Sequence, residues 1–160
     1  MSEINFQNLP NTSTPLNAQN LNEIQKKDII MVKLNSTQAP LSEGENTIVF
    51  NNESFKEGNA FTLQSNGGVK CNVTCKVEIS ALLRFGYSDS STKQTRLYKN
   101  TSQLIETTQQ NATATTQAIT SYFTTVNQND IIYLKAVDSN TGTKSNINAS
   151  ATYMSIRKIN

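Results

Sequence analysis

The chain has 160 residues, of which 16% are charged, and its formal net charge is +2. Asn, Thr, Ser and Gln together account for 68 residues, so uncharged hydrogen-bonding groups supply most of the polar surface. A small and dispersed positive charge excludes the basic footprint of a nucleic-acid-binding protein. No stretch approaches the roughly 20 apolar residues that span a bilayer, which excludes a membrane-spanning helix.

The first residues form a polar leader with no stretch long enough to bury its apolar side chains, among them Phe6, Leu9, Leu16, Leu21 and Ile24. Thr14 followed by Pro15 is a typical helix start, because a hydroxyl caps the first turn and proline suits its first position. We therefore predict one short helix over residues 15–27, which is too short to be stable alone in water. Such a leader is suited to docking onto another protein.

Short strands and polar turns account for the rest of the chain. We predict strands at residues 28–34, 47–50, 60–63, 95–99, 102–107, 118–126, 130–137 and 148–159. Turn residues mark breaks at 88–92, 127–129 and 138–142. Roughly eight to ten short strands, with no convincing helix among them, are typical of an antiparallel sandwich or a jelly roll.

Residues 69–85 contain the clearest pattern, because apolar and polar side chains alternate without a break from Val69 to Phe85. Alternation with a period of two indicates a strand with one buried face. The stretch is longer than a usual strand. We therefore predict a turn or bulge near residues 72–74, followed by a long strand over residues 76–85.

The only cysteines, Cys71 and Cys75, lie within this stretch. Four residues of extended chain separate their α-carbons by about 13 Å, whereas a disulfide needs less than about 7 Å. We expect two free thiols that serve as small apolar core residues. A tight turn between the two cysteines would instead allow a disulfide.

The sequence provides no candidate active site. It contains no His, which removes the usual general base and the commonest metal ligand, and it lacks a Gly-x-Ser-x-Gly elbow. The carboxylate pairs Glu43/Glu45 and Glu53/Glu57 lie in polar sequence that is interpreted as solvated loops. Residues 138–142 begin like a calcium loop but lack its later glycine and glutamate, so they are interpreted as a turn. We expect no enzymatic activity, no metal and no cofactor.

Residues 14–22 read Thr-Pro-Leu-Asn-Ala-Gln-Asn-Leu-Asn. This stretch resembles a start found in fibre, baseplate and head-appendage proteins of tailed bacteriophages, where it precedes a trimeric body. The resemblance implies that the leader anchors the chain to other virion proteins. The implied anchoring residues are Phe6, Leu9, Thr14, Pro15, Leu16, Asn20, Leu21, Asn22 and Ile24.

From about residue 46 onward, the layout resembles the trimeric jelly rolls of the tumour-necrosis-factor and complement type. The corresponding stretches are residues 58–63, 78–85, 126–134 and 151–159. Where that family usually has Gly-Asp, this chain has Asn129-Asp130, and Asn tolerates the left-handed backbone well. The resemblance implies an all-β, antiparallel jelly-roll sandwich preceded by an N-terminal peptide with one short helix. The implied organisation is a leader over residues 1–27, a linker and first strand over 28–45, and a jelly-roll domain over 46–160.

Four residues are predicted to line a threefold axis, namely Leu82, Ile131, Tyr133 and Tyr153. Strand alternation places each of them opposite the core-facing side chains of its strand, where a monomeric sandwich would carry polar groups. Similar jelly rolls pack aromatic residues from such strands around their axis, so the resemblance implies a homotrimer contact. The alternative is ordinary exposed apolar residues on a β surface.

These observations favour a non-enzymatic virion appendage protein, a head fibre or decoration protein that is trimeric and made in a host cytoplasm. Its expected partners are copies of itself, other virion structural proteins and, as a candidate, a host cell-surface glycan. One alternative is a tail or baseplate fibre that binds a receptor. Another is a secreted signalling or lectin-like domain, although residues 1–3 show neither the basic start nor the apolar run of a secretion signal.

Overall fold

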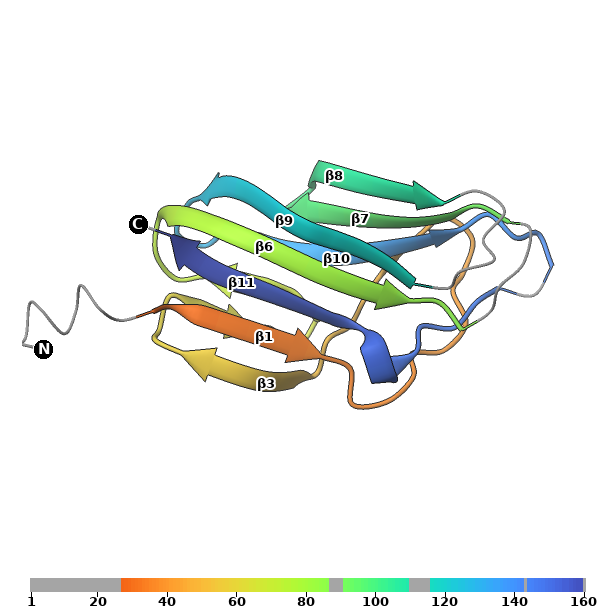
Figure 1. Ribbon diagram of the computed structural model, residues 1–160, viewed down its shortest axis with the longest axis horizontal. Helices are drawn as coiled ribbons and strands as arrows, with labels where there is room; N and C mark the ends of the chain where they lie inside the picture. Colours follow the sequence, from red (N-terminus) through yellow and green to blue (C-terminus); the bar gives the residue numbers. More distant parts are fainter. Residues whose placement is uncertain (1–26, 87–90, 110–115, 143, 160) are drawn as a thin grey trace, which may run out of the picture.

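The computed structural model describes residues 27–86, 91–109, 116–142 and 144–159. Within them the chain forms eleven β-strands and one 3₁₀ turn, η2 (Ala149–Ala151). The strands are β1 (Ile29–Lys33), β2 (Glu45–Thr47), β3 (Asn52–Glu57), β4 (Phe61–Leu63), β5 (Val69–Cys71), β6 (Cys75–Arg84), β7 (Lys93–Lys99), β8 (Ser102–Gln109), β9 (Thr116–Val126), β10 (Ile131–Asp138) and β11 (Tyr153–Ile159). They build two antiparallel sheets that face each other (Figure 1), which confirms the predicted sandwich.

Each sheet joins strands that are distant in the sequence. The five-stranded sheet has the order β3-β1-β11-β6-β9, and the six-stranded sheet has the order β4-β5-β10-β7-β8. The remaining strand of the second sheet is β2. It pairs with the same side of β10 as β5 does, but with the later residues of β10. Such crossovers between two antiparallel sheets are the connectivity of a jelly roll.

The core lies between the sheets and follows the strand alternation. On β6, Val77, Ile79 and Leu83 are fully buried, and Ile132 and Leu134 of β10 are fully buried from the opposite sheet. The prediction for residues 69–85 is confirmed, because β5 ends at Cys71, a bend follows and β6 begins at Cys75. Asn129 has a φ of 75°, the left-handed conformation expected at this position.

Two expectations about strands were wrong. Residues 47–50 are not a strand of their own, because β2 ends at Thr47 and only its last residue overlaps the prediction. The sequence also did not predict β3, whose side chains are exposed along nearly the whole strand. A strand without a buried face has no apolar alternation, so periodicity could not reveal it.

The first strand is an integral part of the sandwich. β1, which the sequence groups with a linker, lies between β3 and β11, and its Ile30 and Val32 are fully buried. The predicted helix and the nine anchoring residues of the leader, from Phe6 to Ile24, lie outside the described residues. No helix in the described ranges is long and apolar enough to cross a membrane.

The two termini of the sandwich lie at the same end (Figure 1). The backbone N–H of Lys158 donates to the carbonyl of Asp28 at 2.8 Å, which ties the last strand to the start of the first. β6 and β10 run from this terminal end to the opposite one, where Asp138 pairs with Lys93. We call the opposite end the loop end, because β6, β8 and β10 all end there.

Candidate functional site: two sheet faces and a loop-end pocket

The outer face of the five-stranded sheet, called the five-stranded face below, carries an apolar centre. Tyr153 of β11 is the direct cross-strand partner of Leu82 of β6, and both side chains are half-buried. Ala118 of β9 lies beside Leu82, and Met31 of β1 belongs to the same outward-facing set. Direct cross-strand neighbours interact, so two of the four predicted axis residues form one contiguous patch.

Two exposed aromatic rings flank this centre. Phe55 on β3 is 50% exposed and Phe123 on β9 is 61% exposed, and they occupy the two edge strands of the same sheet. Phe55 lies opposite Met31, and Phe123 lies opposite the outward-facing Glu78. Among the described residues these are the only exposed aromatic side chains. Exposed apolar surface on both margins of one face is typical of an interaction surface.

A shallow polar hollow interrupts the five-stranded face near the terminal end. It has a volume of about 250 Å³ and is lined by Ile29, Glu78, Ser80, Ser155 and Arg157. The carboxylate of Glu78 accepts hydrogen bonds from Ser121 and from the Arg157 guanidinium. The hydrogen bond from Ser121, followed by that from Arg157, lowers the pKa of Glu78. The two charges of this ion pair compensate each other within the chain, and the Arg157 side chain remains 54% exposed.

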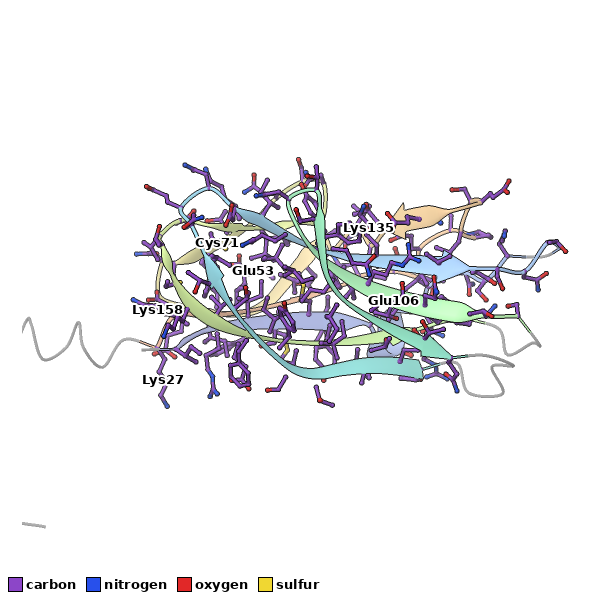
Figure 2. All side chains as sticks on the ribbon, turned by 90° about the horizontal axis from the view of Figure 1, so that it is seen from above. Lys27, Glu53, Cys71, Glu106, Lys135 and Lys158 are labelled. Atoms are coloured by element: carbon purple, nitrogen blue, oxygen red, sulfur yellow. The ribbon has the colours of Figure 1, made fainter. Side chains whose placement is uncertain are left out.

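The outer face of the six-stranded sheet is different, because a closed polar network covers it. Arg96 donates from Nη1 to Glu45 and from Nε to Glu106, each at 2.5 Å. Tyr98 donates its hydroxyl proton to Glu45, and the Lys135 ammonium lies 3.8 Å from the Tyr98 ring centre. Figure 2 labels Glu106 and Lys135, which come from the strands on either side of β7. We call these five residues the polar network.

The polar network strongly favours the ionised form of Glu45. Partial burial works to raise the pKa of this carboxyl group, but hydrogen bonds from Tyr98, Arg96 and Lys135 outweigh it and lower the pKa to about 2. The two carboxylates and two cations of the network also cancel in charge. The charges of the polar network are therefore compensated within the chain.

Ile131 and Tyr133 lie on this second face, and therefore not with Leu82 and Tyr153. Both alternate with the buried Ile132 and Leu134 of β10, so they point away from the core on the six-stranded side. They cover Gly68 of the β4–β5 hairpin, and Asn66 Nδ2 donates to the Tyr133 hydroxyl at 3.0 Å. The prediction of one axis lined by all four residues needs correction, because the sandwich separates them into two pairs on opposite faces.

A small pocket lies at the loop end, beside the last residue of β10. Its volume is about 290 Å³, and its lining consists of Glu43, Gly44, Val137, Asp138, Ser139, Thr141 and Lys144. We call it the loop-end pocket. The turn predicted over residues 138–142 is present, because the N–H groups of Asn140 and Gly142 donate to the side chains of Asp138 and Asn140.

An ion pair without solvent exposure supports the floor of this pocket. Lys93 Nζ lies 2.8 Å from Asp138 Oδ1, and both side chains are 0% exposed. The Asp138 carboxylate also accepts hydrogen bonds from Ser91 Oγ and from the N–H groups of Asn140 and Ser145. Burial works to raise the pKa of Asp138, but these donors, with Lys93 foremost, lower it to about 2.

Both cysteines are free thiols, as predicted. Cys71 is fully buried at the end of β5, and Cys75 is half-buried at the start of β6. The two strands belong to different sheets. Burial, reinforced by the neighbouring Cys75 and Asp130, raises the pKa of Cys71 to about 12. Burial also raises the pKa of Cys75, so neither thiol is activated as a nucleophile.

The carboxylate pairs considered in the sequence are not brought together as acid–base pairs. Glu45 belongs to the polar network, whereas Glu43 lines the loop-end pocket. Glu53 and Glu57 both lie on exposed β3, where Glu53 faces Lys56 at 3.7 Å. Across the part of the chain that the structure describes, no three His, Cys, Asp or Glu side chains gather as a potential metal site.

Sequence reasoning missed Lys93 and Asp138, because charged residues are normally assigned to the surface. The signal was nevertheless present in the strand alternation. Counting back by two from Leu97 gives Thr95 and Lys93, and counting forward from Leu134 gives Ala136 and Asp138. Both charged residues are thus in phase with the core, so strict use of the period would have placed both side chains inside the sandwich, although not as partners.

No protein-family model matches this sequence, and no curated relative does. Several solved structures have the same fold. A crystal structure of murine APRIL at pH 5.0 is 11% identical, with a TM-score of 0.63 over 84% of this chain and 100% of that chain. A structure of the Eiger TNF from S. frugiperda is 11% identical, with a TM-score of 0.59 over 85% of this chain and 94% of that chain. The chain therefore has the jelly-roll fold of the tumour-necrosis-factor proteins.

Proposed function

We propose that this chain is a non-enzymatic virion appendage protein that assembles as a homotrimer through its five-stranded face. One observation carries the assembly: Phe55 and Phe123, the two exposed aromatic rings of the described residues, flank the apolar Leu82–Tyr153 centre of that face. Aromatic and apolar anchors at the centre of a contact supply most of the binding energy of an interface. The six-stranded face, with its paired charges, is left to face solvent.

Three copies arranged around an axis satisfy this geometry. A head-to-tail contact that repeats between copies forms a closed ring when the rotation from one copy to the next divides a full turn evenly. The resemblance to trimeric jelly rolls supports a ring of three. β1 starts at one end of the sandwich (Figure 1), so a threefold arrangement would place the starts of all three copies of β1 at the same end. That arrangement suits anchoring by one end and display by the other.

The virion assignment rests on residues 14–22, whose sequence resembles the start of phage appendage proteins. A single domain behind a short anchor favours a head fibre or decoration protein over a tail or baseplate fibre. The second candidate is a secreted signalling or binding domain, which the shared fold with APRIL and the Eiger TNF favours. Mass spectrometry of purified particles separates the two, because only an appendage protein copurifies stoichiometrically with the capsid.

The self-association is tested by light scattering on the full chain. The expected mass is three times the 17.7 kDa of one chain. Replacing Phe55 and Phe123 together by Lys is expected to give a folded monomer, because both rings are exposed in one copy and the new charges would meet in the contact. A matched control places Lys at Thr101 and Ser102, which are exposed at the β7–β8 turn of the other sheet, and should remain trimeric. A monomeric native chain, or a trimeric Phe55→Lys/Phe123→Lys variant, would refute this interface.

A further inference from the structure

The loop-end pocket is formed before any ligand arrives. Its floor residue Asp138 is held by the buried Lys93 ammonium and by two backbone N–H groups, and the Lys144 ammonium donates to the Asp138 carbonyl at 2.9 Å. Ser139 Oγ accepts from the N–H of Thr92 at 2.8 Å, which fixes a second lining residue. A rigid floor lowers the entropy that a ligand must lose on binding.

The lining presents both donors and acceptors at close range. Lys144 has three ammonium protons, of which one serves the Asp138 carbonyl. Glu43 offers carboxylate oxygens and Thr141 a hydroxyl, and neither side chain has a hydrogen-bond or ion-pair partner among the described residues. Ser139 uses its oxygen as an acceptor, so its hydroxyl proton remains available as a donor.

The charges of the pocket cancel. Glu43 and Lys144 have opposite signs, and Asp138 is neutralised by Lys93. An anionic ligand would be repelled by Glu43, and a cationic ligand would be repelled by Lys144. Val137 is the one aliphatic side chain of the lining, which gives little anchorage to an apolar peptide side chain. The matching ligand is neutral, small and rich in adjacent hydroxyl groups that both donate and accept.

We propose that the loop-end pocket binds a neutral saccharide unit, with Glu43, Thr141 and Lys144 as its hydrogen-bonding residues. The volume of about 290 Å³ lies just below the usual range of about 300 to 1,000 Å³ for ligand pockets, so the pocket suits a ligand no larger than one sugar ring. The pocket is lined by Val137 and Asp138 at the end of β10, and that end of the strand lies opposite the termini of the sandwich (Figure 1), so a sugar on a surface could reach it while the leader is anchored. Only that biological setting, a glycan of a host surface, rests on the proposed function.

The test is saturation-transfer NMR on the full chain with glucose, galactose, rhamnose, N-acetylglucosamine and N-acetylgalactosamine as probes. At least one sugar is expected to give a signal, and Glu43→Gln and Thr141→Val are each expected to weaken its binding, by about tenfold for the charged acceptor. Both side chains are exposed, so neither change should unfold the protein. Glu57→Gln on β3 is the matched control and should bind as the native chain does.

Two results would overturn the proposal: no signal with any of these sugars, or a signal that the Glu43 and Thr141 variants leave unchanged. Inorganic phosphate serves as the charged probe, and its displacement of a bound sugar would assign the pocket to anions instead. Light scattering on the same variants reports assembly separately. A native chain that is trimeric but binds no sugar would refute this inference alone. A native chain that binds sugar but is monomeric would refute the proposed assembly alone.

Discussion

Lys93 and Asp138 face each other across β7 and β10 with Nζ and Oδ1 2.8 Å apart, and neither side chain is exposed to solvent. A buried ion pair gains little over an apolar pair of the same shape, but removing one partner leaves a charge without compensation. The pair therefore holds the backbone at the loop end in place. It links the end of β10 to the start of β7 and, through Ser91, Asn140 and Ser145, to the adjoining loops.

Breaking this pair is expected to be costly. Lys93→Met should lower the free energy of unfolding by about 3 to 5 kcal/mol, since it leaves the Asp138 carboxylate buried without its cation. Lys93→Met combined with Asp138→Asn should cost clearly less than the sum of the single changes, because both remaining groups are neutral. Urea unfolding at a fixed protein concentration measures the two single variants and the double variant.

The exposed Lys56–Glu53 pair on β3 is the control, and its loss should cost no more than about 1 kcal/mol. Additive single changes would show that the two residues do not act together.

Acid should destabilise the protein through Asp138 and Glu45. The folded-state pKa of each is lowered to about 2, below the value of an unfolded carboxyl near 4. Between these values the unfolded chain binds more protons than the folded one, so stability is full above about pH 4.5 and is lost as the pH falls toward 2. Asp138→Asn should make the pH dependence shallower in that window. Thermal unfolding followed from pH 6 to pH 2 checks this, with Glu57→Gln as the exposed comparison.

Two glycines with nearly the same positive φ allow the cost of a steric clash to be separated from the cost of backbone strain. Gly44 has a φ of 82° and Gly67 a φ of 83°, but a Cβ at Gly44 meets nothing within 4 Å. A Cβ at Gly67 would lie 2.4 Å from the α-carbon of Val49. Gly44→Ala should therefore cost only the left-handed strain of about 1 to 2 kcal/mol. Gly67→Ala should cost distinctly more, because backbone must move. Chemical denaturation of both variants compares them, and equal losses would contradict the clash.

Alternation made most of the sandwich predictable. The sequence predicts β6 because apolar side chains recur on one face at a period of two, at Val77, Ile79, Ala81 and Leu83. β3 has no such face, and its pairing with β1 is a tertiary property that the local sequence does not encode. The same limit explains the axis prediction. Alternation identifies residues that face away from the core, but it does not reveal that β10 and β11 belong to different sheets.

The polar network could not be predicted for a related reason. Glu45, Arg96 and Glu106 are far apart in the sequence and become neighbours because β7 pairs with β8 and β10 pairs with β2. Each residue alone has the appearance of an ordinary surface charge. The separation of the two cysteines was easier to predict. The alternating stretch over residues 69–85 exceeds the usual length of one strand, which indicates a bend near residues 72–74.

The thiols should differ in reactivity. Burial raises the pKa of Cys71 to about 12, and this side chain is fully buried, whereas Cys75 is partly accessible. A thiol reagent at pH 8 should therefore modify Cys75 in the native protein and Cys71 only after unfolding. Intact mass should show two free thiols. Cys71→Ala should cost about 1 kcal/mol or somewhat more through lost volume. A native mass lower by two hydrogens would mean a disulfide and would contradict the free-thiol assignment.

Removing residues 1–26 should leave the sandwich folded, provided that Asp28 remains. Asp28 Oδ1 accepts from the N–H groups of Asn59 and Ala60 at 3.0 and 3.1 Å, and its carbonyl accepts from the N–H of Lys158. These bonds close the terminal end around the start of β1. The truncated chain is expected to unfold at the same temperature as the full chain, whereas adding Asp28→Ala should cost about 1 to 3 kcal/mol, because the N–H of the buried Ala60 loses its acceptor.

This pair of variants also separates folding from anchoring. A truncated protein that is folded and trimeric yet missing from purified particles would show that the leader serves docking alone. A truncated protein that still copurifies with particles would contradict the anchoring role of residues 1–26. If truncation alone lowered the unfolding temperature as much as Asp28→Ala does, the leader would be part of the folded body, and its apolar side chains would stabilise the sandwich rather than a virion contact.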